Sequence, residues 1–206
     1  MPLKGLEGKK LLILGGISMS QEIIKHAKEL GLKVYVTDYL HESPAKQYAD
    51  NRSMVSTTEP EALAKLVVEE KADGILTGFV DMLLPYYATV CRKTKLPCYA
   101  TRNQFETLIN KVKFKNLCRK FDIPVVEEYP LDSPFDDAVV RQLKYPVLLK
   151  PADNSGGRGI TICHTPDDFK SGIEKAMSFS KNKQILIERF MLSREVAIFY
   201  MLENGV

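Results

Sequence analysis

The chain has 206 residues, of which 45% are hydrophobic and 27% are charged, enough apolar material for one or two folded domains. Its net charge of +3 is small, and the basic residues are mixed with acidic ones along the chain. This balance argues against nucleic acid as a partner, because nucleic-acid binding needs a concentrated basic face. No apolar run approaches the roughly 18 residues that span a bilayer, so we expect a cytoplasmic protein that binds no membrane.

The first hundred residues alternate predicted strands and helices. Short apolar runs predict strands at Lys10–Leu14, Lys33–Thr37, Met54–Ser56, Gly74–Thr77 and Pro97–Ala100. Between them we expect amphipathic helices, two of them opened by capping boxes at Ser18–Gln21 and Thr58–Glu61, and one over Asp81–Cys91. This alternation predicts a parallel sheet with helices on both faces, whose ligands bind beyond the carboxyl ends of the strands. That edge carries Gly15, Gly16, Asp38, Gly78 and Asp81.

The pattern changes after about residue 100. A lysine-rich helical stretch is expected over Thr101–Asp122, then a strand at Pro124–Tyr129 and a helix at Phe135–Leu143. Further strands are expected at Tyr145–Lys150, Ile160–Cys163, Gln184–Glu188 and Val196–Leu202, with a helix capped by Thr165. A glycine-rich loop, Asp153–Gly159, joins two of these strands as in a hairpin. The second half is therefore predicted to be α+β, with antiparallel pairing.

The cysteines predict no metal site. Cys91, Cys98, Cys118 and Cys163 form no CxxC pair, and no histidine stands at metal-ligand spacing from them. We therefore expect free thiols and assign the three histidines no role.

The sharpest local feature is Lys150 followed by the loop Asp153–Gly159. Glycines let backbone N–H groups approach a phosphate closely, and a lysine adds a mobile positive charge. A plain hairpin turn with a surface lysine explains the same residues. The pattern is not GxxxxGK[ST], so a P-loop is excluded.

Two further segments carry groups that suit a nucleotide. Lys111 opens a helix, although alone it is more often a solvated charge. The segment Ile187–Glu195 follows a strand and places Glu188 and Glu195 seven residues apart. Such a segment can offer backbone groups to a base edge and a carboxylate to ribose hydroxyls, or it can be a surface loop.

In this order, the segments resemble the ATP-grasp superfamily, which includes biotin carboxylase, the large chain of carbamoyl-phosphate synthase and D-alanine–D-alanine ligase. The family's lysine and "xxGIPV" match Asn110-Lys111 and Phe121–Val125. Its "YPVxxKP" with a glycine-rich loop matches Tyr145–Gly159, and its "xxEExxxxxE" matches Ile187–Glu195. The first hundred residues resemble the preceding domain of the purine-pathway members, so the resemblance covers nearly the whole chain.

The resemblance implies a role for each matched residue. Lys111 and Lys150 would contact the ATP phosphates, and Glu195 would hold the ribose. The phosphate lid would be formed by Ser155, Gly156, Gly157 and Gly159, and the adenine hinge by Glu188, Arg189 and Met191. The preceding domain would help to build the substrate pocket, for which the candidates are Gly15, Gly16, Asp38, Gly78, Phe79 and Asp81. Turn glycines and helix caps explain these six residues equally well.

The resemblance also implies a division of the chain: a Rossmann-like domain over 1–105, a small ATP-grasp subdomain over 106–190 and the start of the large subdomain over 191–206. The family's Mg²⁺ ligands would lie beyond residue 206. Because the chain ends at Val206 inside a predicted β-turn, we expect a truncated chain that is inactive by itself. Small-molecule carboxylate and nucleophile substrates are implied, and a homodimer is possible.

The implied function is an ATP-dependent carboxylate–amine or carboxylate–thiol ligase that forms an acyl phosphate. One alternative is an NAD(P)-dependent oxidoreductase, since Gly15-Gly16 follows a strand and Asp38 lies about twenty residues on. The third glycine of that fingerprint is missing. The other alternative is a non-catalytic nucleotide-binding module.

Overall fold

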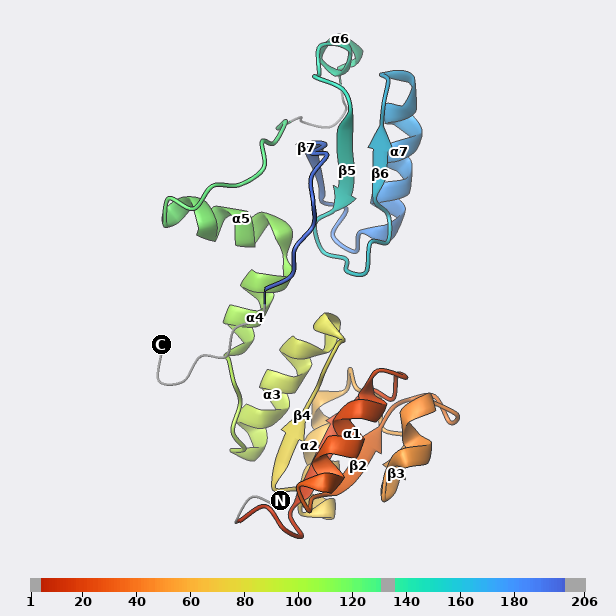
Figure 1. Cartoon of the computed structure of the whole chain (residues 1–206), viewed down its shortest axis with the longest axis vertical. Helices are drawn as coiled ribbons and strands as arrows, with labels where there is room; N and C mark the ends of the chain where they lie inside the picture. The colour runs from red at the N-terminus through yellow and green to blue at the C-terminus, as the bar shows by residue number, and fades with distance from the viewer. Residues whose placement is uncertain (1–4, 131–135, 199–206) are drawn as a thin grey trace. The chain divides into compact units, whose positions relative to one another are not determined.

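The computed structural model describes residues 5–130 and 136–198 (Figure 1). Contacts divide the chain into two units, Met1–Ile123 and Pro124–Val206. Each unit has its own sheet and its own apolar core. Within the described ranges, none of the helices has the length and apolar character needed to cross a membrane. The boundary expected after residue 105, between a Rossmann-like domain and a small ATP-grasp subdomain, stays a prediction.

The sheet of the first unit is parallel, as predicted. Its strands are β1 (Lys10–Leu14), β2 (Lys33–Thr37), β3 (Asn51–Ser53) and β4 (Gly74–Leu76), in the spatial order β3-β2-β1-β4. Its helices are α1 (Ser20–Glu29), η1 (Pro44–Tyr48), α2 (Pro60–Glu70), η2 (Asp81–Leu83), α3 (Leu84–Thr94), α4 (Arg102–Ile109) and α5 (Lys111–Lys120), where η denotes a 3₁₀ helix.

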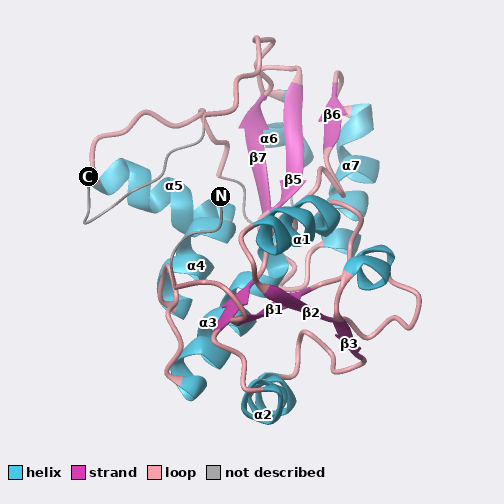
Figure 2. Ribbon diagram, turned by 60° about the horizontal axis from the view of Figure 1, so that its bottom comes forward, coloured by secondary structure: helices cyan, strands magenta, loops and turns pink. Residues whose placement is uncertain are grey.

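Helices cover both faces of this sheet because β1 is apolar on both sides. Leu12 and Leu14 of β1 are buried in one cluster with residues of α2 and α3. Ile13, which points to the other face, is buried in a second cluster with residues of α1 and η1. Figure 2 shows α1 and α2 on opposite sides of the strands. The carboxyl ends of the strands therefore form an edge between two helical layers.

Side-chain caps from Thr101 and Asn110 divide the lysine-rich stretch into two helices. Thr101 and Gln104 form a capping box that opens α4. Asn110 ends α4 with an extended backbone, and its side-chain oxygen accepts a hydrogen bond from the N–H of Lys113 at 3.0 Å. The predicted helical stretch is thus two helices, and Lys111 is the first residue of the second one.

The second unit is antiparallel, also as predicted. Its strands are β5 (Val147–Pro151), β6 (Thr161–Cys163) and β7 (Ile185–Arg189), and its helices are α6 (Asp137–Arg141) and α7 (Asp167–Phe179). Figure 1 shows β5 between β6 and β7. Val147, Leu149 and Ile187 are buried against Phe169 and Ile173 of α7. The alternate residues of β5 and β7 point to the opposite face of this sheet.

Several strand predictions were wrong in position or kind. The third strand is β3, which ends before the predicted Met54–Ser56. Residues 97–100 form no strand, and this segment is tied to β4 by a side chain: the Tyr99 hydroxyl donates to the carbonyl of Thr77 at 3.2 Å. Residues 124–129 form a single bridge to Glu188 of β7 instead of a full strand.

The predicted capping boxes of α1 and α2 were also wrong. At α1, the N–H of Gln21 donates to the backbone carbonyl of Ser18, and the helix begins at Ser20 without a side-chain cap. At α2, Pro60 stands at the first helical position and the N-cap Glu59 has no side-chain cap. The predicted helix at Asp81 begins as the 3₁₀ turn η2.

The last predicted strand, Val196–Leu202, falls partly outside the described residues. Residues 196–198 have no regular secondary structure, and 199–202 lie outside the described ranges. Phe135, the first residue of the predicted helix Phe135–Leu143, also lies outside the described ranges. The structure has this helix as α6.

Candidate functional site

The tip of the glycine-rich loop presents backbone donors. Gly156, Gly157 and Gly159 all have positive φ angles, of 67°, 71° and 78°. A Cβ atom at Gly156 or Gly157 would meet nothing within 4 Å, so the tip is open. Within the described part of the chain, the backbone N–H groups of residues 156–159 donate to no protein atom. Successive free amides in a glycine turn are suited to hold an anion.

The base of the same loop is fixed by packing and hydrogen bonds. A Cβ atom at Gly159 would lie 2.7 Å from both Phe179 Cβ and Pro151 Cγ, so only glycine fits there. The Asn154 side chain donates to the Phe179 carbonyl at 2.8 Å and accepts from the N–H of Ser155 at 2.8 Å. The N–H of Ser155 is therefore engaged inside the loop, and the open donors begin at residue 156.

Asp153 anchors this loop to the turn that follows α7. One carboxylate oxygen accepts from the Ser180 hydroxyl at 2.7 Å, and the other accepts from the N–H of Asn182 at 2.9 Å. Burial by itself raises the pKa of Asp153, but these hydrogen bonds outweigh it and hold that pKa below its ordinary value. The charged form of Asp153 thus stabilises the second unit.

Lys150 and Glu188 form an ion pair on the face of the sheet opposite to α7. The Lys150 Nζ lies 2.6 Å from Glu188 Oε2, and the side chains are 18% and 3% exposed. The register explains the contact, because Glu188 pairs with Leu148, two residues before Lys150 on the same face of β5. The sequence marked both residues, but their contact was not predicted. The contact directs the lysine charge back along β5 toward the position of Leu148.

The segment after β7 is partly engaged. The N–H of Arg189 donates to the Glu127 carbonyl at 3.1 Å, and the N–H of Phe190 donates to the Pro146 carbonyl at 3.1 Å. Met191 is half-exposed, and its N–H donates to no atom of the described residues. Glu195 is exposed in a segment without regular structure.

Lys111 belongs to the first unit, whereas Lys150, Glu188 and Glu195 belong to the second. Asn110 fixes the helix start from which Lys111 projects. The convergence of the two lysines around one ligand stays a prediction. Among residues 5–130 and 136–198, no three His, Cys, Asp or Glu side chains gather where they could hold a metal ion.

At the carboxyl edge of the parallel sheet, Asp38 is used inside the protein. Its Oδ2 accepts from the N–H of Gly16 at 2.8 Å, and its Oδ1 accepts from the N–H of Leu40 at 2.9 Å. A Cβ atom at Gly16 would overlap Ser43 Oγ, and Gly15 has a φ angle of 94°. Packing and turn geometry therefore account for Gly15, Gly16 and Asp38.

Of the other three candidates at this edge, one is explained by packing and two face solvent. A Cβ atom at Gly78 would overlap the side chain of Ile23, so this glycine is required by packing. Phe79 is 61% exposed with a φ angle of 63°, and Asp81 is exposed at the start of η2. Phe79 and Asp81 are thus the members of this group that face solvent in the described structure.

Lys46 was missed by the sequence reasoning. It is 4% exposed, and its Nζ donates to the Asp38 carbonyl at 2.7 Å and to the Leu40 carbonyl. The buried cation fixes the loop after β2 at the sheet edge. A single lysine in a short polar stretch carries no periodic signal, so its burial could not be predicted from local pattern.

The matching family model is "Carbamoyl-phosphate synthase L chain, ATP binding domain", which covers residues 110–199. Among curated proteins, the formate-dependent phosphoribosylglycinamide formyltransferase of Prochlorococcus marinus is 24% identical over 188 residues, covering 89% of this chain and 48% of that protein. The enzyme of the same name from Bacillus subtilis is 22% identical, with 90% and 49% covered. The chain spans about half the length of the curated relatives it matches.

Solved structures show the same fold. The biotin carboxylase domain of Hydrogenobacter thermophilus 2-oxoglutarate carboxylase, solved as a dimer with MgADP and bicarbonate, aligns with a TM-score of 0.70 and 23% identity, covering 89% of this chain and 44% of that one. The N5-carboxyaminoimidazole synthetase of Staphylococcus aureus, solved with ADP, aligns with a TM-score of 0.72 and 19% identity, covering 92% and 50%.

A four-stranded parallel sheet followed by a small antiparallel sheet matches the N-terminal half of these structures. The chain is thus similar to members of the ATP-grasp superfamily over roughly half of their length.

The variants Gly157→Ala and Gly159→Ala compare the loss of unfolding free energy at the open tip of the loop with the loss at its packed base. Both place alanine at a positive φ angle, which costs about 1–2 kcal/mol. Only Gly159→Ala adds a collision with Phe179 and Pro151, so its loss of unfolding free energy should be larger by about 2 kcal/mol. Urea denaturation measures both losses, and equal losses would contradict the packing of Gly159.

Lys150→Met should lower the free energy of unfolding by about 3 kcal/mol, because it removes the cation beside the buried Glu188 carboxylate. Lys150→Met/Glu188→Leu should recover part of this loss, since the Glu188 carboxylate is removed together with the cation. Urea denaturation of wild type, both variants and the exposed control Lys144→Met makes the comparison. A double variant as unstable as Lys150→Met would rule out the ion pair as the cause.

Asp153→Asn should change the acid dependence of stability. Because the folded pKa of Asp153 is lowered, its contribution is present above the ordinary value of 3.8 and is lost as the pH falls through the folded value. The variant should be less stable than wild type by about 1 kcal/mol at pH 6, and the gap should narrow below pH 3.8. Unfolding curves at pH 6 and pH 3 test this, and a gap that stays constant would refute it.

Proposed function

We propose that this chain binds ATP and forms the phosphate-holding part of an ATP-grasp ligase. The observation that carries the proposal is the loop tip, where the four backbone N–H groups of residues 156–159 have no acceptor within the described part of the chain. The loop follows directly on the strand that carries Lys150. Anion-binding amides next to a lysine are chemically suited to a chain of phosphates.

Under this proposal, Lys150 changes partner when the nucleotide binds. Its Nζ is held by Glu188 at 2.6 Å, on the face of the sheet opposite to α7. A triphosphate carries more negative charge than one carboxylate, so it can draw the ammonium group toward the loop. Lys111, at the start of α5, supplies the second positive charge. Gly156, Gly157 and Gly159 form the lid together with Ser155, whose own N–H is already bonded to Asn154.

The base and sugar are assigned to the segment after β7. Because the N–H groups of Arg189 and Phe190 already donate to carbonyl groups, Met191 is the residue whose N–H is left to meet the adenine edge. Glu188 then orients Lys150, and Glu195 accepts from the ribose hydroxyls. Met191 adds an apolar surface against the base.

ATP would supply the phosphoryl group that activates a carboxylate as an acyl phosphate with release of ADP, and an amine or thiol would then displace inorganic phosphate. The residues of this chain contribute binding and orientation of the phosphates, and they add positive charge where negative charge gathers. Phe79 and Asp81 are the exposed residues of the sheet edge that we assign to the substrate. Mg²⁺ ligands are assigned to the part of the relatives that this chain does not match.

The oxidoreductase alternative loses its support from Asp38. In a dinucleotide site this carboxylate would accept from ribose hydroxyls. Here both of its oxygens accept from backbone N–H groups, of Gly16 and Leu40. NADH is therefore expected not to bind.

The test is a fluorescence titration of the 206-residue chain with a labelled ATP analogue. We expect saturable binding that Lys150→Ala and Lys111→Ala each weaken about tenfold, because each removes one charge-assisted contact. Lys144→Ala, an exposed lysine of the second unit, is the matched control and should bind as wild type does.

Circular dichroism and urea denaturation of each variant establish that it is folded at the titration temperature. If Lys111→Ala, Lys150→Ala and Lys144→Ala all bound the ATP analogue with the same affinity, the assignment would be overturned. Saturable binding of NADH would overturn it as well. Lys111→Ala keeps the test decisive if Lys150→Ala unfolds, because Lys111 lies in the other unit.

A further inference from the structure

The first unit contains a groove that the proposed nucleotide site does not use. It lies between α3 and α4 and has a volume of about 690 Å³. The residues that matter for its chemistry are Thr89, Arg92, Cys98, Tyr99, Arg102 and Glu106. A volume of this size is within the range of about 300–1,000 Å³ that is typical of small-molecule sites.

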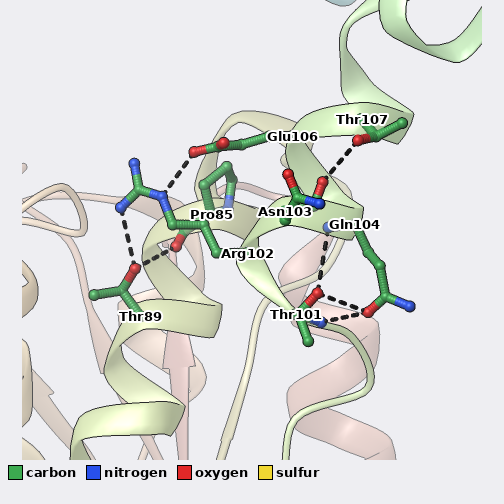
Figure 3. A network of polar contacts seen from close by, with 8 residues as sticks. All are labelled: Pro85, Thr89, Thr101, Arg102, Asn103, Gln104, Glu106 and Thr107. Carbon is green, nitrogen blue, oxygen red and sulfur yellow. Dashed lines mark hydrogen bonds and ion pairs between the residues drawn. The ribbon is translucent and has the colours of Figure 1, made fainter.

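Arg102 is held in a defined orientation in this groove (Figure 3). Its Nε donates to Glu106 Oε1 at 2.7 Å, and its Nη1 donates to Thr89 Oγ1 at 3.2 Å. Thr89 is itself fixed, because its hydroxyl donates to the Pro85 carbonyl at 2.8 Å. Within the described residues, Nη2 of Arg102 donates to no protein atom. The guanidinium group is therefore positioned before any ligand arrives, with one nitrogen left to offer.

Arg92 adds a second positive charge to the same groove. It projects from α3, one turn after Thr89, and no acidic side chain of the described residues pairs with it. With Glu106 as the acidic side chain in the lining, the groove has a formal charge of +1. This surplus favours an anion.

One of the residues that line the groove, Tyr99, is aromatic. Tyr99 is 58% exposed, and its ring packs on Tyr87 with a centroid distance of 4.9 Å and edge-on to Phe105 at 5.4 Å. Its hydroxyl is fixed by donation to Thr77. A supported, exposed ring next to two guanidinium groups suits a ligand that has both a flat apolar body and a negative charge.

We propose that this groove binds a small organic oxyanion, a carboxylate or a phosphate ester with a flat apolar body. Arg92 and Arg102 hold the anionic group, and Tyr99 packs against the apolar body. The site differs from the residues assigned to the nucleotide phosphates, none of which line the groove. It also differs from the sheet-edge residues after β1, β2 and β4.

Cys98 provides a direct readout, because it lines the groove and is the exposed member of the four cysteines of the chain. Cys91, Cys118 and Cys163 are all buried, and burial raises the pKa of the Cys91 thiol to about 12, so alkylation at pH 8 reports on Cys98. The experiment measures the rate of Cys98 alkylation by iodoacetamide in the full chain at increasing concentrations of 2-naphthoate and, separately, of 2-naphthyl phosphate.

We expect saturable protection of Cys98, at least fivefold at the highest probe concentration. The concentration for half protection should rise about tenfold in Arg92→Gln and in Arg102→Gln, since each loses a charge-assisted contact. Arg52→Gln changes the same charge at an exposed position outside the groove and should leave protection unchanged. The probe with the lower half-protection concentration identifies the preferred anion as carboxylate or phosphate.

Absence of protection by both probes would overturn the proposal, as would protection that survives unchanged in Arg92→Gln. Protection by acetate or inorganic phosphate equal to that by the naphthyl probes would overturn the role of Tyr99. Arg92→Gln keeps the test decisive if Arg102→Gln unfolds, because Arg92 has no acidic partner among the described residues that its loss would leave unpaired.

Discussion

The alternation of side chains along β5 and β7 determines what the second unit can offer to a ligand. Val147, Leu149 and Ile187 point to α7 and form the core. The opposite face therefore receives Lys150 and Glu188, which meet at 2.6 Å. A shift of one residue in β5 would turn Lys150 into the core, and a shift in β7 would turn Glu188 there. The core packing therefore also determines where the two charges lie.

Features set by neighbouring residues could be predicted from the sequence. The hairpin around the glycine-rich loop and the helix start at Lys111 rest on short local patterns, and the parallel first sheet rests on the alternation of strands and helices. The ion pair between Lys150 and Glu188 joins two strands separated by β6 and α7, so its geometry needed the structure. The same is true of the groove, since Arg102 and Thr89 come from different helices.

The errors have a common physical origin. Predicted capping boxes at Ser18 and Thr58 obeyed local rules, but a backbone turn and a proline at the first helical position set those two helix starts. The position of Asp38 at the end of a strand suggested that its carboxylate could bind a ligand. In the structure, both of its oxygens accept hydrogen bonds from backbone N–H groups. In each case, a hydrogen bond or packing contact of the folded chain decided between alternatives that the sequence left equal.

The pairing of Lys150 with Glu188 also bears on which anions the second unit can retain. A bare ammonium group would attract chloride, sulfate or a free carboxylate as readily as anything larger. A lysine that already has a carboxylate at hydrogen-bond distance yields only to a competitor that brings several charges at once. Under the proposed function, the contact with Glu188 therefore favours anions of several charges over monovalent anions at Lys150.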